Sequence, residues 1–213
     1  MFSTYASARE VLTDQFQPSG TDYIIHVLGD SSREEYLNCF NEGNFDYVVT
    51  MRREFTLWEY WVVRANWFFY REMYNNYQPV YSNSYETYWE KNYSNKENSI
   101  YNSYNVQIID IDDTTKKLII QTDVNINGFA DVYLDYSVEK NSVFVFNPML
   151  HVANTQPWAV HFDSNFLRAE GAEYIPITVK NGYGEVTITS NPQKHTTLNV
   201  NAVSCDRIIN VQP

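Results

Sequence analysis

The chain has 213 residues, of which 44% are hydrophobic, so it is long enough for one large domain or two small ones and too apolar for disorder. Its formal net charge of −11 repels phosphate backbones, which argues against a nucleic-acid partner. No run of about 18 apolar residues occurs, so we expect no membrane insertion by this segment.

Three helices are predicted in the first part of the chain, each from a Ser or Thr followed three residues later by Glu. They begin at Ser7, Ser32 and Thr56. The hydroxyl there accepts a hydrogen bond from a backbone amide of the first turn, and the Glu side chain reaches back to the backbone amide of the Ser or Thr. The second helix is expected to end at Gly43 in a left-handed cap. Short apolar runs at residues 23–28 and 45–49 flank this helix and predict two buried, parallel strands.

The third predicted helix is long and aromatic. Trp58, Val62, Phe69 and Met73 recur at helical spacing, with Trp61 on an adjoining stripe, which is typical of a core helix. After it, Pro79 and several Asn and Ser residues prevent a continuous helix, so residues 77–89 are predicted to form an exposed, Tyr-rich connector. Residues 91–105 are polar and indicate a linker or long loop.

From residue 105 onward the pattern is that of short strands without a helical period. A turn is expected at residues 112–116, and Asn127-Gly128 is typical of a hairpin. The predicted strands are residues 106–111, 117–121, 129–136, 142–146, 158–162, 174–179, 185–189 and 198–203. The sequence therefore predicts an α+β fold, in which residues 1–100 form a small α/β unit whose long aromatic helix packs against an antiparallel β-sandwich at residues 101–213.

Few residues form a pattern that indicates chemistry. Asp123, Asn125 and Asn127 resemble the opening of a calcium loop, but Leu134 stands where the bidentate acid belongs, so a hairpin is favoured. Asp110 and Asp112 are candidates for sharing a cation, against the simpler interpretation of solvated acids at a hairpin tip.

Two other segments near the start of the chain have an ordinary structural explanation as well. Asp22 and His26 are candidates for a carboxylate-oriented base on one strand face, against a structural histidine. The segment from Gly29 to Arg33 is a candidate anion site, against an ordinary strand-to-helix turn.

The cysteine content excludes a cysteine-rich zinc site, because Cys39 and Cys205 are the only cysteines and neither lies in a CxxC pair. Whether the two thiols pair is left open, with buried free thiols favoured. We expect no metal and no cofactor.

Four stretches carry a family resemblance: STYASAREV, QPSGTDYIIHVLGD, FNPMLHV with the following PW, and EYIPITVKNGYGEVTI. Together they resemble the extracytoplasmic C-terminal portion of bacterial polytopic membrane glycosyltransferases. The resemblance implies a piece of a longer protein with many membrane helices, located at the cell surface or on the periplasmic side. In such proteins the catalytic acids belong to the membrane part, so the resemblance assigns no catalytic residue here.

The first hypothesis for function is a non-catalytic, extracytoplasmic domain of a membrane-bound glycan-handling protein. Its expected partner is either a glycan or its own membrane portion. A glycan is expected because sugar C–H faces stack on Tyr and Trp rings. The candidate ligand residues are Tyr77, Tyr81, Tyr85, Trp89 and Trp158. The alternatives are a carbohydrate-active hydrolase that uses two carboxylates among Glu59, Glu86 and Glu90, and a structural or assembly protein.

Overall fold

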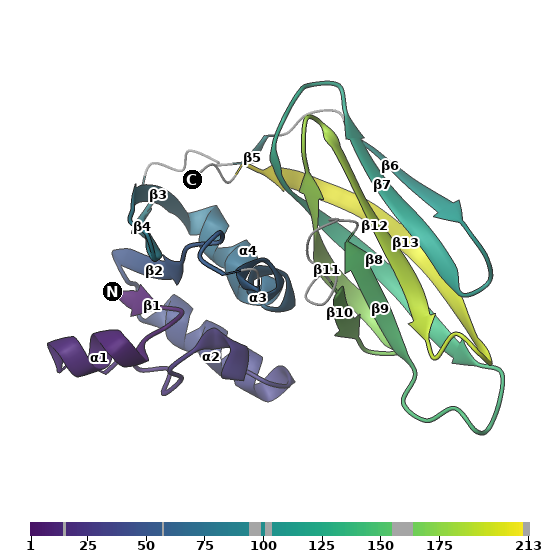
Figure 1. Cartoon of the computed structure of the whole chain (residues 1–213), viewed down its shortest axis with the longest axis horizontal. Coiled ribbons are helices and arrows are strands. Elements are labelled where there is room, and N and C mark those ends of the chain that lie inside the picture. The colour runs from purple at the N-terminus through teal and green to yellow at the C-terminus, as the bar shows by residue number, and fades with distance from the viewer. Residues whose placement is uncertain (15, 57, 94–98, 101–103, 155–163, 211–213) are drawn as a thin grey trace. The chain divides into compact units, whose positions relative to one another are not determined.

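A computed structural model describes residues 1–14, 16–56, 58–93, 99–100, 104–154 and 164–210. The chain divides into two compact units, Met1–Asn98 and Ser99–Gln212 (Figure 1). The first combines helices with a small sheet, and the described residues of the second contain strands and no helix, which confirms the predicted α+β class. No helix in the described part of the chain is long and apolar enough to cross a membrane.

The first unit is built on a four-stranded sheet with the order β1-β2-β4-β3. Strands β1 and β2 are parallel, whereas β4 runs antiparallel to both of its neighbours. The strands are β1 (Phe2–Ser3), β2 (Tyr47–Met51), β3 (Tyr77–Ser82) and β4 (Glu86–Lys91). The helices are α1 (Ser7–Thr13), the 3₁₀ helix η1 (Ile24–His26), α2 (Asp30–Glu42), α3 (Glu59–Ala65) and α4 (Trp67–Asn76).

An aromatic cluster forms the core of this unit. The Phe69 ring lies 4.9–5.8 Å from the rings of Phe2, Tyr36, Phe40 and Tyr70, centre to centre. Phe69 and Phe2 are completely buried. Such rings exclude much apolar surface from water and add pairwise contacts between ring edges and faces, so they hold helices α2 and α4 against the sheet.

The long aromatic helix predicted from the sequence is two helices. The break falls at Asn66, whose backbone leaves the helical range (φ −113°, ψ 33°) and whose side-chain amide donates to the Val62 carbonyl at 2.9 Å. An Asn side chain that bonds a carbonyl four residues earlier competes with the helical ladder. Trp58 is 38% exposed, so it is not part of the buried stripe, and Trp61 is half-buried.

The predicted strand at residues 23–28 is also wrong, because η1 occupies its centre. The strand parallel to β2 is instead β1, which has two residues and is too short to show a sequence period. The helix boundaries differ as well: α2 starts at Asp30, and its end at Glu42 is followed by Gly43 in a right-handed conformation. The residue in the left-handed conformation is Asn44 (φ 45°). Asn adopts this conformation more readily than most residues.

The predicted connector at residues 77–89 is a β-hairpin of β3 and β4. Pro79 is tolerated because β3 is an edge strand that pairs only with β4, and a register shift follows it between Pro79 and Tyr81. Asn83 shapes the turn by accepting hydrogen bonds from the backbone amides of Tyr85 and Glu86 at 2.7 and 2.8 Å.

The second unit is a sandwich of a five-stranded and a four-stranded sheet, with the orders β10-β9-β12-β7-β6 and β11-β8-β13-β5. Its described core contains Leu118, Ile120, Val132, Leu134, Tyr136, Leu150, Ile177, Val186 and Ile188, which alternate along their strands. The strands are β5 (Ser99–Ile100), β6 (Tyr104–Asp110), β7 (Thr115–Thr122), β8 (Gly128–Lys140), β9 (Met149–Asn154), β10 (Ser164–Leu167), β11 (Glu170–Val179), β12 (Tyr183–Asn191) and β13 (Thr196–Ile209).

The predicted Asn127-Gly128 hairpin is wrong, because β7 and β8 belong to different sheets. The two-residue turn forms instead at Asn181-Gly182, where both residues have positive φ (52° and 78°) and Lys180 pairs with Tyr183. The predicted strand at residues 142–146 is a loop, and residues 158–162 lie outside the described part of the chain. The hairpin of β6 and β7 is confirmed.

Candidate functional site

The sheet of the first unit has one apolar face and one polar, aromatic face. Strand register aligns Ser3, Val49, Tyr88 and Tyr81 in one row across all four strands. Because side chains alternate along a strand, their neighbours Phe2, Val48 and Trp89 point to the opposite, core face, where all three are buried. The row through Tyr88 therefore lies on the opposite face, called the outer face below, together with Glu86 and Glu90 of β4. Within that row Ser3 and Val49 are buried, whereas Tyr81 at the β3 edge is exposed.

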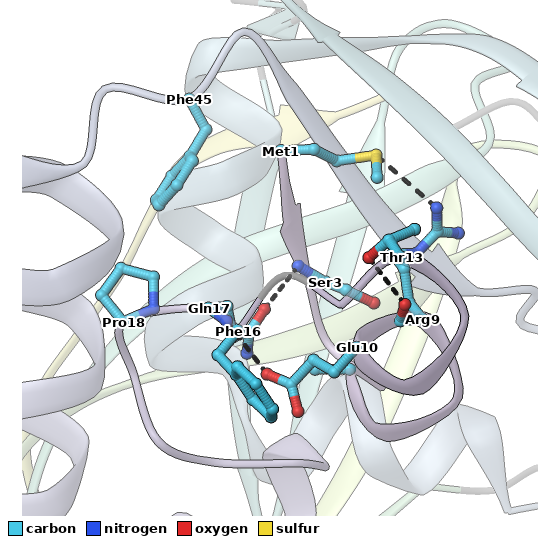
Figure 2. A pocket seen from close by; sticks show the side chains of 10 residues that line it. Met1, Ser3, Arg9, Glu10, Thr13, Phe16, Gln17, Pro18 and Phe45 are labelled. Atoms are coloured by element: carbon cyan, nitrogen blue, oxygen red, sulfur yellow. Dashed lines mark hydrogen bonds between the residues drawn. The ribbon is translucent and has the colours of Figure 1, made fainter.

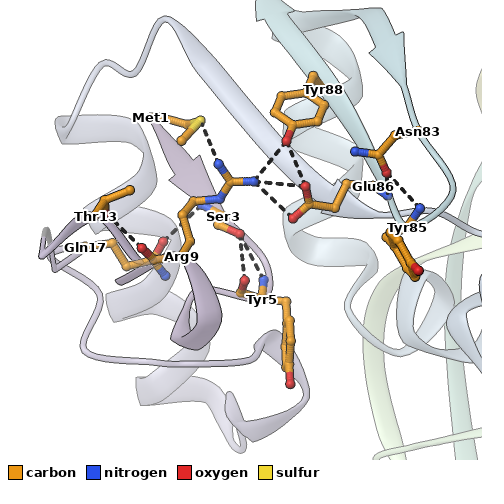
Figure 3. A network of polar contacts seen from close by, with 10 residues as sticks. All are labelled: Met1, Ser3, Tyr5, Arg9, Thr13, Gln17, Asn83, Tyr85, Glu86 and Tyr88. Atoms are coloured by element: carbon orange, nitrogen blue, oxygen red, sulfur yellow. Dashed lines mark hydrogen bonds and ion pairs between the residues drawn. The ribbon is translucent and has the colours of Figure 1, made fainter. Parts of the chain in front are cut away.

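Arg9 of α1 reaches this outer face and holds a polar network there (Figure 3). Its Nη2 atom donates to both carboxylate oxygens of Glu86 at 3.0 Å and to the Tyr88 hydroxyl at 3.3 Å. The Tyr88 hydroxyl in turn donates to Glu86 Oε2 at 2.8 Å. Burial works to lower the pKa of the Arg9 guanidinium, but the bonds to Tyr88 and Glu86 outweigh it and raise that pKa, so Arg9 is cationic.

A pocket of about 250 Å³ lies beside this network (Figure 2). Its wall combines polar side chains from β1 and α1 with apolar ones, and Arg9 belongs both to the pocket and to the network. The pocket is shaped by Gln17, which accepts from the Ser3 amide at 3.0 Å, and by Glu10, which accepts from the Gln17 amide at 3.0 Å. The lining residues are Met1, Ser3, Ala6, Arg9, Glu10, Thr13, Phe16, Gln17, Pro18 and Phe45.

Two of the predicted ligand residues present their rings to solvent. Tyr81 and Tyr85 are each 60% exposed on the β3–β4 hairpin. The Tyr81 ring lies 5.6 Å from that of Tyr88, and the Tyr85 ring meets Phe55 edge-on at 5.3 Å. Exposed rings held by neighbouring rings keep one face open for a partner while losing little freedom on binding.

The other predicted ligand residues differ. Tyr77 and Trp89 are 3% and 5% exposed, and their polar atoms are used internally: the Tyr77 hydroxyl donates to the Phe45 carbonyl at 2.7 Å and the Trp89 indole to the Thr50 hydroxyl at 3.0 Å. Buried rings offer no face to a ligand, which corrects the expectation for these two residues. Trp158 lies outside the described residues.

Tyrosine–carboxylate pairs continue along the same sheet. The Tyr47 hydroxyl donates to Glu90 at 2.9 Å, and the Tyr93 hydroxyl donates to Asp46 at 2.6 Å. In each pair the hydrogen bond to the carboxylate raises the pKa of the tyrosine, so both phenols are neutral donors at neutral pH. Tyr47 and Tyr93 are 43% and 72% exposed and extend the aromatic surface.

The three acids proposed for hydrolysis lie in different environments. Glu59 is 3% exposed and accepts from the Tyr23 hydroxyl at 3.1 Å, and burial raises its pKa. Glu86 is paired with Arg9, and Glu90 accepts from Tyr47. Glu59 is therefore a buried acid on α3, whereas Glu86 and Glu90 are hydrogen-bonded acids on β4.

The remaining sequence candidates have structural roles. His26 Nδ1 and Asp22 Oδ1 are 2.7 Å apart, but both side chains are more than half exposed. His26 lies at the end of η1 and Asp22 in the bend before it, so neither is on a strand. Asp110 pairs with Lys116, and Asp112 accepts from Thr114, as expected for a hairpin tip. Within the described residues, no three His, Cys, Asp or Glu side chains come together as a metal site. Cys39 and Cys205 are free thiols.

Arg9 and Tyr88 were missed by sequence reasoning. Arg9 is separated from Glu86 by 77 positions, and no local pattern reports a contact over that distance. The alternation Glu86, Tyr88, Glu90 was the available signal, since a strand places these residues on one face. No protein-family model matches the sequence, and the comparison with curated proteins gave no significant match.

Proposed function

We propose that the first unit binds a glycan, without turning it over, on the outer face of its sheet. The observation that carries the proposal is the exposure of Tyr81 and Tyr85, 60% each, on the hairpin that also holds Glu86 and Tyr88. Sugar rings combine apolar C–H faces with hydroxyl groups, so they need aromatic platforms and hydrogen-bonding groups within one surface.

Polar groups next to these rings suit that chemistry. Glu86 is held by Arg9 and Tyr88 in one geometry, and a fixed carboxylate accepts hydrogen bonds from sugar hydroxyls at little cost in conformational freedom. The adjoining pocket of about 250 Å³ is lined by both polar and apolar side chains, and it is smaller than the roughly 300–1,000 Å³ of a site for a drug-sized ligand, so it suits a single sugar ring.

The ion pair also favours binding over hydrolysis. Both carboxylate oxygens of Glu86 accept hydrogen bonds from Arg9, and Oε2 accepts a further one from the Tyr88 hydroxyl, so this carboxylate is already held in an internal network. We therefore expect intact ligand after incubation. Stacking on an exposed ring is worth about 1 kcal/mol, so the affinity of a single site should lie between millimolar and high micromolar.

The wider setting belongs to the same proposal. The sequence resemblance supports an extracytoplasmic domain of a membrane-bound glycan-handling protein, with that protein's membrane portion as a second partner. Its test is the genomic reading frame upstream of Met1, which should encode apolar spans of about 20 residues. A frame that opens at Met1 would refute the membrane setting and leave the glycan surface to be tested separately.

The test of binding begins with a glycan array and continues with titration of any hit by NMR. Tyr81→Ala and Tyr85→Ala should each weaken binding by about fivefold to tenfold. Tyr183→Ala is the control, because Tyr183 is also exposed (45%) but belongs to the second unit. Loss of binding in the control as well would show that the response is not specific to the sheet.

Mass analysis of the incubated ligand separates binding from hydrolysis. Intact ligand supports the proposal, whereas cleavage that Glu86→Gln abolishes would replace it with the hydrolase. If the array gives no hit, the glycan proposal fails, and an interaction surface for a protein partner becomes the better explanation of the exposed tyrosines.

A further inference from the structure

Among the described residues of the second unit, the loop between β8 and β9 carries the most exposed large apolar side chains. Val143, Phe144 and Phe146 are 86%, 83% and 80% exposed. They lie within four consecutive positions, whereas exposed apolar residues on a monomer are ordinarily scattered. In Figure 1 the loop extends beyond the ends of the strands.

The loop has a defined conformation that holds these side chains outward. Val145, between the two phenylalanines, is only 6% exposed and anchors the loop. The Ser142 hydroxyl accepts from the Phe144 amide at 3.3 Å, and the Ser142 carbonyl accepts from the Val145 amide at 3.3 Å. At its start, the Asn141 amide donates to the His195 carbonyl at 2.8 Å. The apolar tip is therefore preformed and does not need to be ordered on binding.

We propose that this tip enters the interface of a zwitterionic phospholipid bilayer, a peripheral contact that differs from the insertion of a membrane-spanning segment. Together the three side chains offer roughly 500 Å² of apolar surface, less than the roughly 800 Å² per partner of a stable protein interface. A bilayer interface sets no such minimum, because a projecting side chain gains its full transfer free energy as it enters the acyl boundary. Two phenylalanines on a short loop are suited to that partner.

The charges around the tip select the kind of lipid. Exposed Lys140 and Glu139 precede the loop on β8. Beside them, exposed Lys194 adjoins His195, whose carbonyl accepts from the Asn141 amide, and the carbonyl of exposed Asp113 accepts from Leu198 of β13, so neither sign dominates. The chain as a whole carries a net charge of −11, which repels anionic lipid over a Debye length. A zwitterionic headgroup layer matches both facts.

Sedimentation with phosphatidylcholine vesicles tests the proposal on the whole chain. Wild-type protein should sediment with the vesicles, and Phe144→Ser/Phe146→Ser should lower the partition coefficient by about tenfold or more. Adding phosphatidylserine to the vesicles should weaken wild-type binding at low salt. The matched control is Leu28→Ser, because Leu28 is 74% exposed but lies in the first unit, and vesicle binding of this variant should equal that of wild type.

Thermal melts should show that both variants are folded, since the substituted side chains are exposed. The proposal is overturned if wild-type protein stays in the supernatant, or if the double variant binds vesicles as well as wild type. Sedimentation velocity without lipid supplies a further arm. A dimer that forms with rising concentration and is lost in the double variant would identify a second copy as the occupant and overturn insertion.

Discussion

Replacing Phe69 by Ala should remove the centre of the aromatic core of the first unit. The Phe69 side chain is completely buried and contacts the rings of Phe2, Tyr36, Phe40 and Tyr70, the closest with its centre at 4.9 Å. Truncating a buried phenylalanine costs about 3–5 kcal/mol, because transfer free energy is lost and a cavity remains. The four ring contacts add to the transfer free energy, so we expect the free energy of unfolding to fall by about 4–5 kcal/mol, near the upper end of this range.

The assay is urea unfolding followed by tryptophan emission. Trp58, Trp61, Trp67 and Trp89 lie in the first unit and only Trp158 in the second, so the signal reports mainly on the unit that carries the mutation. Phe16→Ala is the control, since a side chain that is 79% exposed should cost less than about 0.5 kcal/mol. A loss below about 1 kcal/mol for Phe69→Ala would refute an aromatic core centred on this ring.

Burial raises the pKa of Glu59, so the folded protein holds this proton more tightly than the unfolded chain does. Stability should therefore fall as the pH rises from the ordinary value near 4.5 through the folded pKa, and Glu59→Gln should flatten that part of a urea-midpoint profile against pH. Gly128→Ala should destabilise the second unit by about 1–3 kcal/mol in thermal unfolding, because a Cβ there would lie 2.2 Å from the Ile209 carbonyl oxygen; an unchanged melt would contradict this close approach. Melts with calcium and with chelator should coincide, because Leu134 stands in place of the bidentate acid and Asp131 is buried beside Arg207 at 3.4 Å; an upward shift of several degrees with calcium would refute this.

The β-rich second half was the part that could be predicted most fully. Val132, Leu134 and Tyr136 alternate with polar residues along β8, and this period of two indicates a strand with one buried face wherever it lies in a fold. Pairing was harder to predict. The same Asn-Gly signal occurs at residues 127–128 and 181–182, and at both places the chain passes from one sheet to the other. Only the second forms a two-residue turn, which the bridge between Lys180 and Tyr183 closes before β11 and β12 enter different sheets.

In the first unit, local patterns were overridden by tertiary contacts. Asn66 interrupts a segment of continuous helical period because its side chain donates to the Val62 carbonyl, and Pro79 lies in a strand because that strand has a free edge. The exposed Tyr81 and Tyr85 were among the predicted ligand residues, but so were the buried Tyr77 and Trp89. In the sequence, a buried tyrosine cannot be distinguished from an exposed one until the register of its strand is known.

The sequence by itself determined the features that depend on residues close together in the chain. These are the alternating strands of the sandwich, the helical period of the aromatic segment and the absence of a long apolar span. Only the tertiary structure decided which tyrosines face solvent and that Arg9 meets Glu86 across 77 positions. The physical reason is that periodicity and turn propensity act over a few residues, whereas the face a side chain occupies depends on strand partners brought together by folding. The candidate glycan surface and the apolar tip at residues 143–146 both belong to this second kind of information.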